Sequence, residues 1–247
     1  ALLLIWWFPI PKGYLKKIFF ASLIANTLQY SITYTGLNYI DASAAVLLVQ
    51  TEVPFGVIFA FFMLKEKPTI RALIGIAIAF VGVYILTGSP NLEGKFFGIS
   101  LTIIGSAIWA LGQVIVKPLS KEINPLALVA WLALFSGPLL IALSSIIDGD
   151  TIKYLSEAKF DHWIIAFYIG FIMQPVTYGC FYYVLKNNPL YKVLPIVTMG
   201  IPPTGLLAAI FLLGEKPTQE LFIGGAIIIV GVILIVFTKN KTEEVEK

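Results

Sequence analysis

The hexapeptide LKEKPT at residues 64–69 recurs as LGEKPT at residues 213–218, at an offset of 149 residues. With this offset held and no gaps introduced, 18 of the 50 positions from Tyr34 to Val83 are identical to their partners. Apolar segments share some identities through composition alone, but a matched EKPT tetrapeptide with matched prolines and glycines around it indicates a true repeat. The chain therefore contains an internal duplication, and this duplication decides the fold.

The segments around both copies are apolar enough to cross a membrane. Of the 247 residues, 58% are hydrophobic and 13% are charged, and the mean hydropathy is +0.90, unlike a soluble domain. A spanning helix needs about 20 apolar residues, and a helix is expected because unpaired backbone groups are costly in lipid. We predict an all-α integral membrane protein, a multi-span helical bundle with eight full spans. They cover about residues 18–37, 41–64, 70–87, 96–117, 125–147, 162–184, 189–213 and 219–237.

The two halves are predicted to be inverted relative to each other. Five spans separate the EKPT copies, and an odd number places the copies on opposite sides of the membrane. Of the 17 Lys and Arg residues, 13 fall on one side, which predicts that this side and the C-terminus are cytoplasmic in a cell membrane protein. Inverted repeats are a transporter architecture with the substrate site near the midplane.

The repeat also predicts the domain organisation. We assign 1–87 to a first, N-terminally truncated repeat, 88–238 to a second repeat, and 239–247 to a cytoplasmic tail. A repeat unit of five helices implies a ten-helix parent. The short apolar stretch ALLLIWWFPI at 1–10 is interpreted as the end of a span, with the first one to two helices of the parent missing.

Each half carries a proline ahead of an LxE triplet, followed by a span with two glycines seven residues apart. These residues are Pro54, Leu64-Lys65-Glu66, Gly75 and Gly82 in the first half, and Pro203, Leu213-Gly214-Glu215, Gly224 and Gly231 in the second. The pattern resembles the EamA-type family of the drug/metabolite transporter superfamily, and SAIWALGQV at 106–114 is similar to the tryptophan-bearing first span of that family's second half. The resemblance implies a ten-helix inverted-repeat carrier of small metabolites, often an exporter, with both termini cytoplasmic.

Glu52, in VQTEVPFG at 49–56, is the acid that lies near the middle of a predicted span. An ionised carboxylate is costly there, so the side chain should be paired or protonated. It is our candidate for proton coupling or for holding a cationic group; the alternative is a protonated glutamate that only packs against a neighbouring amide. The family often has glutamate directly before the proline, whereas Glu52 precedes Pro54 by two, and Ile201-Pro202-Pro203 in the second half has no acid.

Polar and aromatic side chains recur three and four residues apart on three predicted spans, which places each set on one helix face. Such faces should turn toward the bundle interior or a wet cavity. The alternative is that they form hydrogen bonds between packed helices. We predict that they line a shared cavity for a small amphipathic or cationic metabolite. The candidate substrate-binding residues are Asn26, Gln29, Tyr30, Thr33, Gln50, Glu52, Ser106, Trp109, Gln113, Gln174, Tyr178 and Tyr182.

Three prolines are predicted to interrupt helices inside spans. Pro54, Pro202 and Pro203 each remove a backbone donor, which frees a carbonyl four residues earlier. Such mid-span carbonyls can face substrate in discontinuous transporter helices; the alternative is a simple kink. The EKPT segments are interpreted as helix-start signals, and the paired glycines as sites of close helix packing.

These features predict a secondary transporter that exports or exchanges amino acids or similar small amphipathic compounds by alternating access. The runner-up is a nucleotide-sugar or drug transporter of the same superfamily. An intramembrane enzyme is less favoured because the chain has no HExxH motif and no mid-span aspartate pair, and a channel is less favoured because the duplication does not supply a ring of like residues. We predict a small-molecule substrate, membrane lipid and a coupling proton as partners, with no nucleic acid, cofactor or metal.

Overall fold

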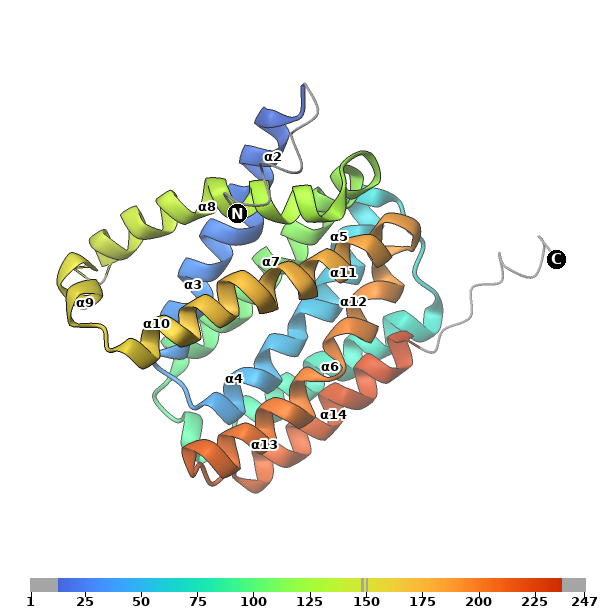
Figure 1. Cartoon of the computed structure of the whole chain (residues 1–247). Coiled ribbons are helices and arrows are strands. Elements are labelled where there is room, and N and C mark those ends of the chain that lie inside the picture. The colour runs from blue at the N-terminus through green and yellow to red at the C-terminus, as the bar shows by residue number, and fades with distance from the viewer. Residues whose placement is uncertain (1–12, 148, 150, 237–247) are drawn as a thin grey trace. The chain divides into compact units, whose positions relative to one another are not determined.

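The computed structural model describes residues 13–147, 149 and 151–236 (Figure 1). This part of the chain is helical and contains no strand. The stretch at 1–10 and the predicted tail at 239–247 lie outside the described residues. The elements are α2 (Leu15–Ser22), η1 (Leu23–Leu28), α3 (Gln29–Leu37), α4 (Ala42–Leu48), η2 (Val49–Thr51), α5 (Glu52–Leu64), α6 (Ile70–Thr87), η3 (Pro90–Leu92), α7 (Phe96–Glu122), α8 (Pro125–Ile147), α9 (Thr151–Glu157), α10 (Phe160–Phe167), η4 (Tyr168–Met173), α11 (Gln174–Asn187), α12 (Leu190–Thr198), α13 (Ile201–Leu213) and α14 (Gln219–Val236).

Within the described residues, six helices are long and apolar enough to cross a membrane, which confirms the predicted multi-span helical protein. They cover Ala42–Leu64, Ile70–Thr87, Phe96–Glu122, Pro125–Ile147, Phe160–Asn187 and Leu190–Leu213. The other two predicted spans are also helical but differ from these six. The helix formed by α2, η1 and α3 carries lysines and amides that lower its hydropathy, and the apolar part of α14, Gln219–Ile235, is shorter.

The chain divides into two compact units, and each unit combines segments from both sequence halves. Unit 1 comprises Ala1–Ser31 and Ile115–Asn188, and unit 2 comprises Ile32–Val114 and Pro189–Lys247. Compact units are defined by contacts and repeats by sequence similarity, so the predicted repeat boundaries stay a prediction.

In unit 2, α6 and α14 occupy equivalent places in the two repeats and pack side by side (Figure 1). A Cβ atom added to Gly75 would lie 2.5 Å from the carbonyl oxygen of Gly231, and one added to Gly82 would lie 2.8 Å from that of Gly224. The order of these contacts shows that the two helices run antiparallel, as an inverted repeat requires. The glycines allow two backbones to touch, which is the role predicted for them.

We expect Gly75→Ala and Gly82→Ala to destabilise the protein, because each new methyl group would collide with backbone atoms of α14. Overpacking of this kind costs about 1–3 kcal/mol. Thermal unfolding of the purified protein in detergent measures the effect. Gly170→Ala is the control, since a Cβ there meets no atom within 4 Å, and equal melting temperatures for all three variants would contradict the assignment.

The helices that precede the two EKPT segments end in the same way. Lys65 has φ 56° and Gly214 has φ 69°, both in the left-handed region. The N–H groups of Glu66 and Glu215 then bond back to the carbonyl oxygens of Ala60 and Ala209, at 3.2 and 3.1 Å. Glycine suits this conformation, so Lys65 has a strained backbone that its repeat partner avoids.

We expect Lys65→Gly to stabilise the protein and Gly214→Lys to destabilise it, each by about 1 kcal/mol, because the left-handed conformation disfavours residues with a Cβ. The two variants exchange the residues of equivalent positions, so each serves as the other's control. Opposite shifts in melting temperature are expected. A lower melting temperature for Lys65→Gly would contradict the backbone assignment.

Two spans of unit 2 are interrupted at equivalent places. One changes from α4 to α5 through a 3₁₀ turn at Val49–Thr51, and the other changes from α12 to α13 around 199–200, close to the residues at the offset of 149. The interruptions lie just before the mid-span prolines, although a hinge role for those prolines stays a prediction. A Cβ on Gly56 would collide with Leu194, and one on Gly205 would lie 2.6 Å from Val46, so the two spans also cross antiparallel.

The EKPT glutamates hold the beginnings of these interrupted spans. The carboxylate of Glu215 accepts hydrogen bonds from the N–H groups of Ala42 and Ser43, at 2.8 and 2.9 Å. The carboxylate of Glu66 accepts them from Leu190 and Tyr191, at 3.2 and 3.3 Å. Each glutamate therefore caps the N-terminal turn of a span that belongs to the other repeat.

The environment of Glu215 favours its charged form. Burial raises the pKa of this carboxyl, but hydrogen bonds from Ser43 and Ala42 and the positive charge of Lys95 lower it, and together they hold the pKa below its ordinary value. Glu215 is thus a carboxylate at neutral pH, which suits it to a helix N-terminus.

The threonines of the two EKPT segments begin the next helices. The hydroxyl oxygen of Thr69 accepts a hydrogen bond from the N–H of Ala72 at 3.3 Å, and that of Thr218 accepts one from Leu221 at 3.4 Å. This is N-capping, and it confirms the interpretation of EKPT as a helix-start signal. The glutamate of the motif has the additional capping role that the sequence interpretation missed.

Candidate functional site

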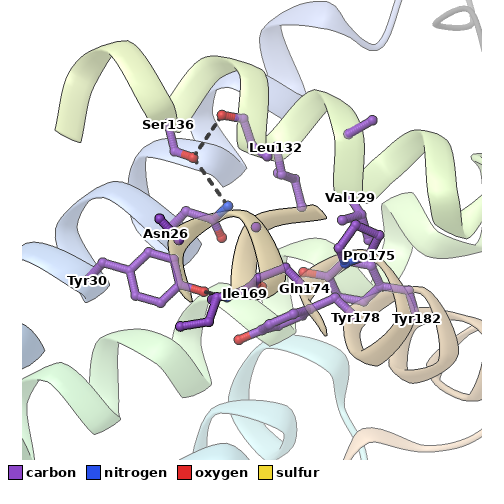
Figure 2. A pocket seen from close by; sticks show the side chains of 14 residues that line it. Asn26, Tyr30, Val129, Leu132, Ser136, Ile169, Gln174, Pro175, Tyr178 and Tyr182 are labelled. Carbon is purple, nitrogen blue, oxygen red and sulfur yellow. Dashed lines mark hydrogen bonds between the residues drawn. The ribbon is translucent and has the colours of Figure 1, made fainter. Parts of the chain in front are cut away.

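Unit 1 contains a pocket of about 340 Å³ between the helix of α2, η1 and α3, helix α8, and the helix of α10, η4 and α11 (Figure 2). Its volume is near the lower end of the range of small-molecule sites. Figure 2 shows Asn26 and Tyr30 on one side, Leu132 and Ser136 of α8 on another, and Gln174, Tyr178 and Tyr182 of α11 on a third.

Two π-helical segments border this pocket, one in each of two spans that are equivalent in the repeat. The segment η1 contributes Asn26, and η4 contributes Ile169 and Gly170. A π-helical turn shifts the register of the side chains that follow it, and such turns are frequent at functional sites. The pocket therefore lies where both spans depart from regular α-helix.

Hydrogen bonds within unit 1 fix the polar wall of the pocket. The hydroxyl of Ser22 donates to the carbonyl oxygen of Leu132 at 2.8 Å, one turn from Asn26. The amide of Asn26 donates to the hydroxyl oxygen of Ser136 at 3.5 Å (Figure 2), a long contact. The amide of Gln174 donates to the hydroxyl oxygen of Tyr30 at 3.0 Å. These bonds leave the carbonyl oxygens of both amides as further acceptors at the pocket wall.

Aromatic rings form a second wall, on the α11 side from which Gln174 also projects. The rings of Tyr178 and Tyr182 lie 5.8 Å apart, and Phe181 contacts both, at 6.2 and 5.4 Å between ring centroids. Tyr182 is 1% exposed, so the neighbouring side chains hold its ring in place. Among the described residues that line the pocket, none is Asp, Glu, Lys, Arg or His. The pocket thus offers amides, hydroxyls and aromatic faces but no formal charge.

In unit 2, the first half of α7 packs against the end of α3. A Cβ on Gly105 would collide with Thr33. Thr33 therefore packs against Gly105, the residue that precedes Ser106 in the sequence. Thr33 and Ser106 are buried, and Trp109 is half-buried. The hydroxyl of Ser106 donates to the carbonyl oxygen of Thr102 in its own helix at 2.8 Å. This internal bond satisfies the Ser106 hydroxyl proton without a ligand.

Three other predicted site residues of unit 2 are buried. Gln50 and Gln113 are each 1% exposed, and Glu52 is 5% exposed. The amide nitrogen of Gln50 and the amide oxygen of Gln113 have no hydrogen-bond partner among the described residues. Buried polar atoms without partners are rare and costly, so these two atoms mark positions that suit a water molecule or a polar ligand group.

The predicted site residues therefore fall into two groups. Asn26, Tyr30, Gln174, Tyr178 and Tyr182 line the unit 1 pocket, and Gln29 is buried nearby in the same unit without lining it. The remainder lie in unit 2; they are Thr33, Gln50, Glu52, Ser106, Trp109 and Gln113.

Ser136 is a pocket residue that the sequence interpretation missed. It lies in an apolar span one residue before Gly137-Pro138, and an isolated hydroxyl in such a span was the available signal.

Comparison with known proteins decides the family. The sequence profile of the EamA-like transporter family matches residues 1–88 and 96–237. The chain belongs to the EamA-like transporter family. The resemblance found in its repeated motifs is therefore confirmed.

Curated EamA-like relatives match over most of the chain at low identity. A "probable amino-acid metabolite efflux pump" of Escherichia coli is 28% identical over 236 residues, which cover 92% of this chain and 78% of the relative. A protein with the same description from Salmonella typhimurium is 26% identical over 237 residues, with 92% and 78% covered. An "uncharacterized transporter" of Clostridium kluyveri is 26% identical over 243 residues, with 95% and 75% covered.

Family membership and the apolar helices establish the general role of this EamA-like chain. It is a multi-pass membrane protein and a small-molecule transporter rather than an enzyme.

Proposed function

We propose that this EamA-like protein is a secondary carrier that exports an amino acid or a similar small amphipathic metabolite by alternating access. The unit 1 pocket carries the proposal. Its polar wall suits the ammonium and carboxylate groups of a zwitterion through amide and hydroxyl contacts, and its aromatic wall suits an apolar or cationic part. The descriptions of the E. coli and Salmonella relatives as amino-acid metabolite efflux pumps support this substrate class.

The absence of a charged side chain among the described lining residues narrows the substrate class further. A phosphorylated substrate would require basic partners to offset its charge. A compound with no net charge requires only hydrogen bonds and apolar contact, which this pocket offers. We therefore favour a neutral or zwitterionic metabolite over a nucleotide sugar.

We assign substrate contact to Asn26, Tyr30, Gln174, Tyr178 and Tyr182, which share this pocket. A second set of proposed contacts lies in unit 2, and its members are Thr33, Gln50, Glu52, Ser106, Trp109 and Gln113. Pro54, Pro202 and Pro203 would serve as hinges beside the interruptions of the two unit 2 spans.

Glu52 is proposed as the residue that couples transport to a proton. Glu52 is 5% exposed, and it is the first residue of α5, directly after the 3₁₀ turn at Val49–Thr51. A buried carboxyl can bind and release a proton as its access to water changes, which links proton movement to the opening of the carrier. The charge distribution of the loops supports a location in the cell membrane with a cytoplasmic C-terminus.

Uptake into proteoliposomes tests the proposed function and the pocket together. Counterflow of radiolabelled neutral amino acids should be saturable. Tyr178→Ala should raise the KM by roughly tenfold through loss of an aromatic contact. Tyr183→Ala is the matched control, because Tyr183 lies on the same helix but is 65% exposed and does not line the pocket. Equal effects of the two variants, or no counterflow of any amino acid, would argue against this assignment.

A second variant tests coupling. Glu52→Gln keeps the shape of a protonated carboxyl but cannot release a proton, so we expect proton-driven uptake to be lost while the protein is still produced. Uptake should be measured in proteoliposomes with and without an imposed pH gradient. Glu93→Gln, at an exposed acid, is the control. Uptake kinetics and pH dependence that remain unchanged in Glu52→Gln would reject the coupling role.

A further inference from the structure

The capping contacts of Glu66 and Glu215 join the two repeats at opposite ends of unit 2. Each EKPT segment directly precedes α6 or α14, and these two helices pack antiparallel. The beginning of α6 therefore lies beside the end of α14, and the two EKPT segments lie at opposite ends of the pair (Figure 1). Each end of unit 2 thus has one carboxylate that bridges two N–H groups of the other repeat.

A local side chain normally caps a helix N-terminus, but here the cap comes from a distant one. Asp41 holds the N-cap position of α4, yet its side chain makes no capping bond. Its carboxylate instead lies 3.1 Å from the amino group of Lys95. The first N–H groups of α4 are bonded by Glu215, which is more than 170 residues away in sequence. At the beginning of α4, a bond from the other repeat thus takes the place of the cap that Asp41 would otherwise provide.

The interruptions divide each capped span into two helical segments. Ala42–Leu48 lies between the Glu215 cap and the 3₁₀ turn, and Leu190–Thr198 lies between the Glu66 cap and the break before α13. Alternating access in inverted-repeat carriers moves one repeat against the other. A contact between repeats at one end must then loosen when the carrier opens at that end.

Resting on the alternating access proposed above, we propose that Glu66 and Glu215 are positioning residues for transport, which act as a pair of latches at the two ends of unit 2. Each holds one interrupted span closed against the other repeat, and its release favours opening at its own end. The latches differ in tightness, because the N–H···O distances are 2.8 and 2.9 Å at Glu215 but 3.2 and 3.3 Å at Glu66. Shorter charge-assisted bonds are stronger, so the Glu215 end is the more firmly closed in this structure.

Side-specific thiol labelling of the full chain tests the latches without knowledge of the substrate. The background carries Cys180→Ala, which removes the sole native cysteine, and Ser106→Cys, a buried probe position of unit 2. A membrane-impermeant maleimide is applied to right-side-out and inside-out vesicles, and the ratio of the two labelling rates is measured. Glu66→Gln and Glu215→Gln should shift this ratio in opposite directions by about fivefold, the effect of losing one helix cap. Glu93→Gln and Glu122→Gln, at exposed acids, should leave it within about twofold.

Two further measurements separate a latch from a residue that only supports the fold. Hydrogen exchange should quicken at Ala42 and Ser43 in Glu215→Gln, and at Leu190 and Tyr191 in Glu66→Gln. Aspartate variants, which keep the charge, should restore at least half of the shift in the labelling ratio, and they serve as the test if a glutamine variant does not fold. A ratio that shifts in the same direction for both glutamates, or that stays unchanged although the cap amides exchange faster, would overturn the proposal.

Discussion

The backbone contact between α6 and α14 is the interaction on which the arrangement of unit 2 depends. Glycines at equivalent positions of the two repeats meet across it, Gly75 with Gly231 and Gly82 with Gly224. Apolar side chains supply little net attraction between helices in lipid, because the tails are equally apolar, so close backbone packing carries more of the association. The same contact sets the two helices antiparallel, and it thereby places the two EKPT segments at opposite ends of the pair.

The interrupted spans illustrate how a membrane protein can carry irregular backbone. Freed N–H and C=O groups are tolerated at membrane depth only where protein or a cavity satisfies them. The interruptions around 49–51 and 199–200 lie in two spans that pack against each other, and the first turns of those spans are bonded by Glu215 and Glu66. These bonds lie at the beginnings of the spans rather than at the interruptions, and there each repeat supplies the carboxylate that bonds the first N–H groups of the other.

The pocket of unit 1 depends on a different local feature. Both spans that are equivalent in the repeat contain a π-helical turn there, at η1 and η4. The residues around these turns differ between the halves, with Asn26 and Tyr30 in one and Gln174, Tyr178 and Tyr182 in the other. A shared backbone distortion with different side chains gives a pocket that combines amides and hydroxyls with aromatic rings. The duplication therefore builds the frame of the pocket, and divergence between the copies builds its chemistry.

The sequence by itself determined the helical membrane fold, the repeat and the family. An apolar stretch of about 20 residues can cross a membrane, and a helix is the structure that pairs its backbone groups there. The repeat is visible in the sequence because Pro, Gly and EKPT residues occur at matching positions in the two halves. It also identified five residues that line the unit 1 pocket, because polar side chains at helical spacing must avoid lipid.

Only the tertiary structure decided which polar residues share a pocket and what the EKPT glutamates contact. Helical spacing fixes the face of a residue on its own helix, but it does not specify which helix lies opposite. Ser136 lines the pocket because α8 packs there. Tyr30 lines the same pocket, but Thr33, three residues later on the same helix, packs against α7 in unit 2. The cap of α4 by Glu215 joins groups distant in sequence, and such a bond depends on chain packing that no local pattern encodes.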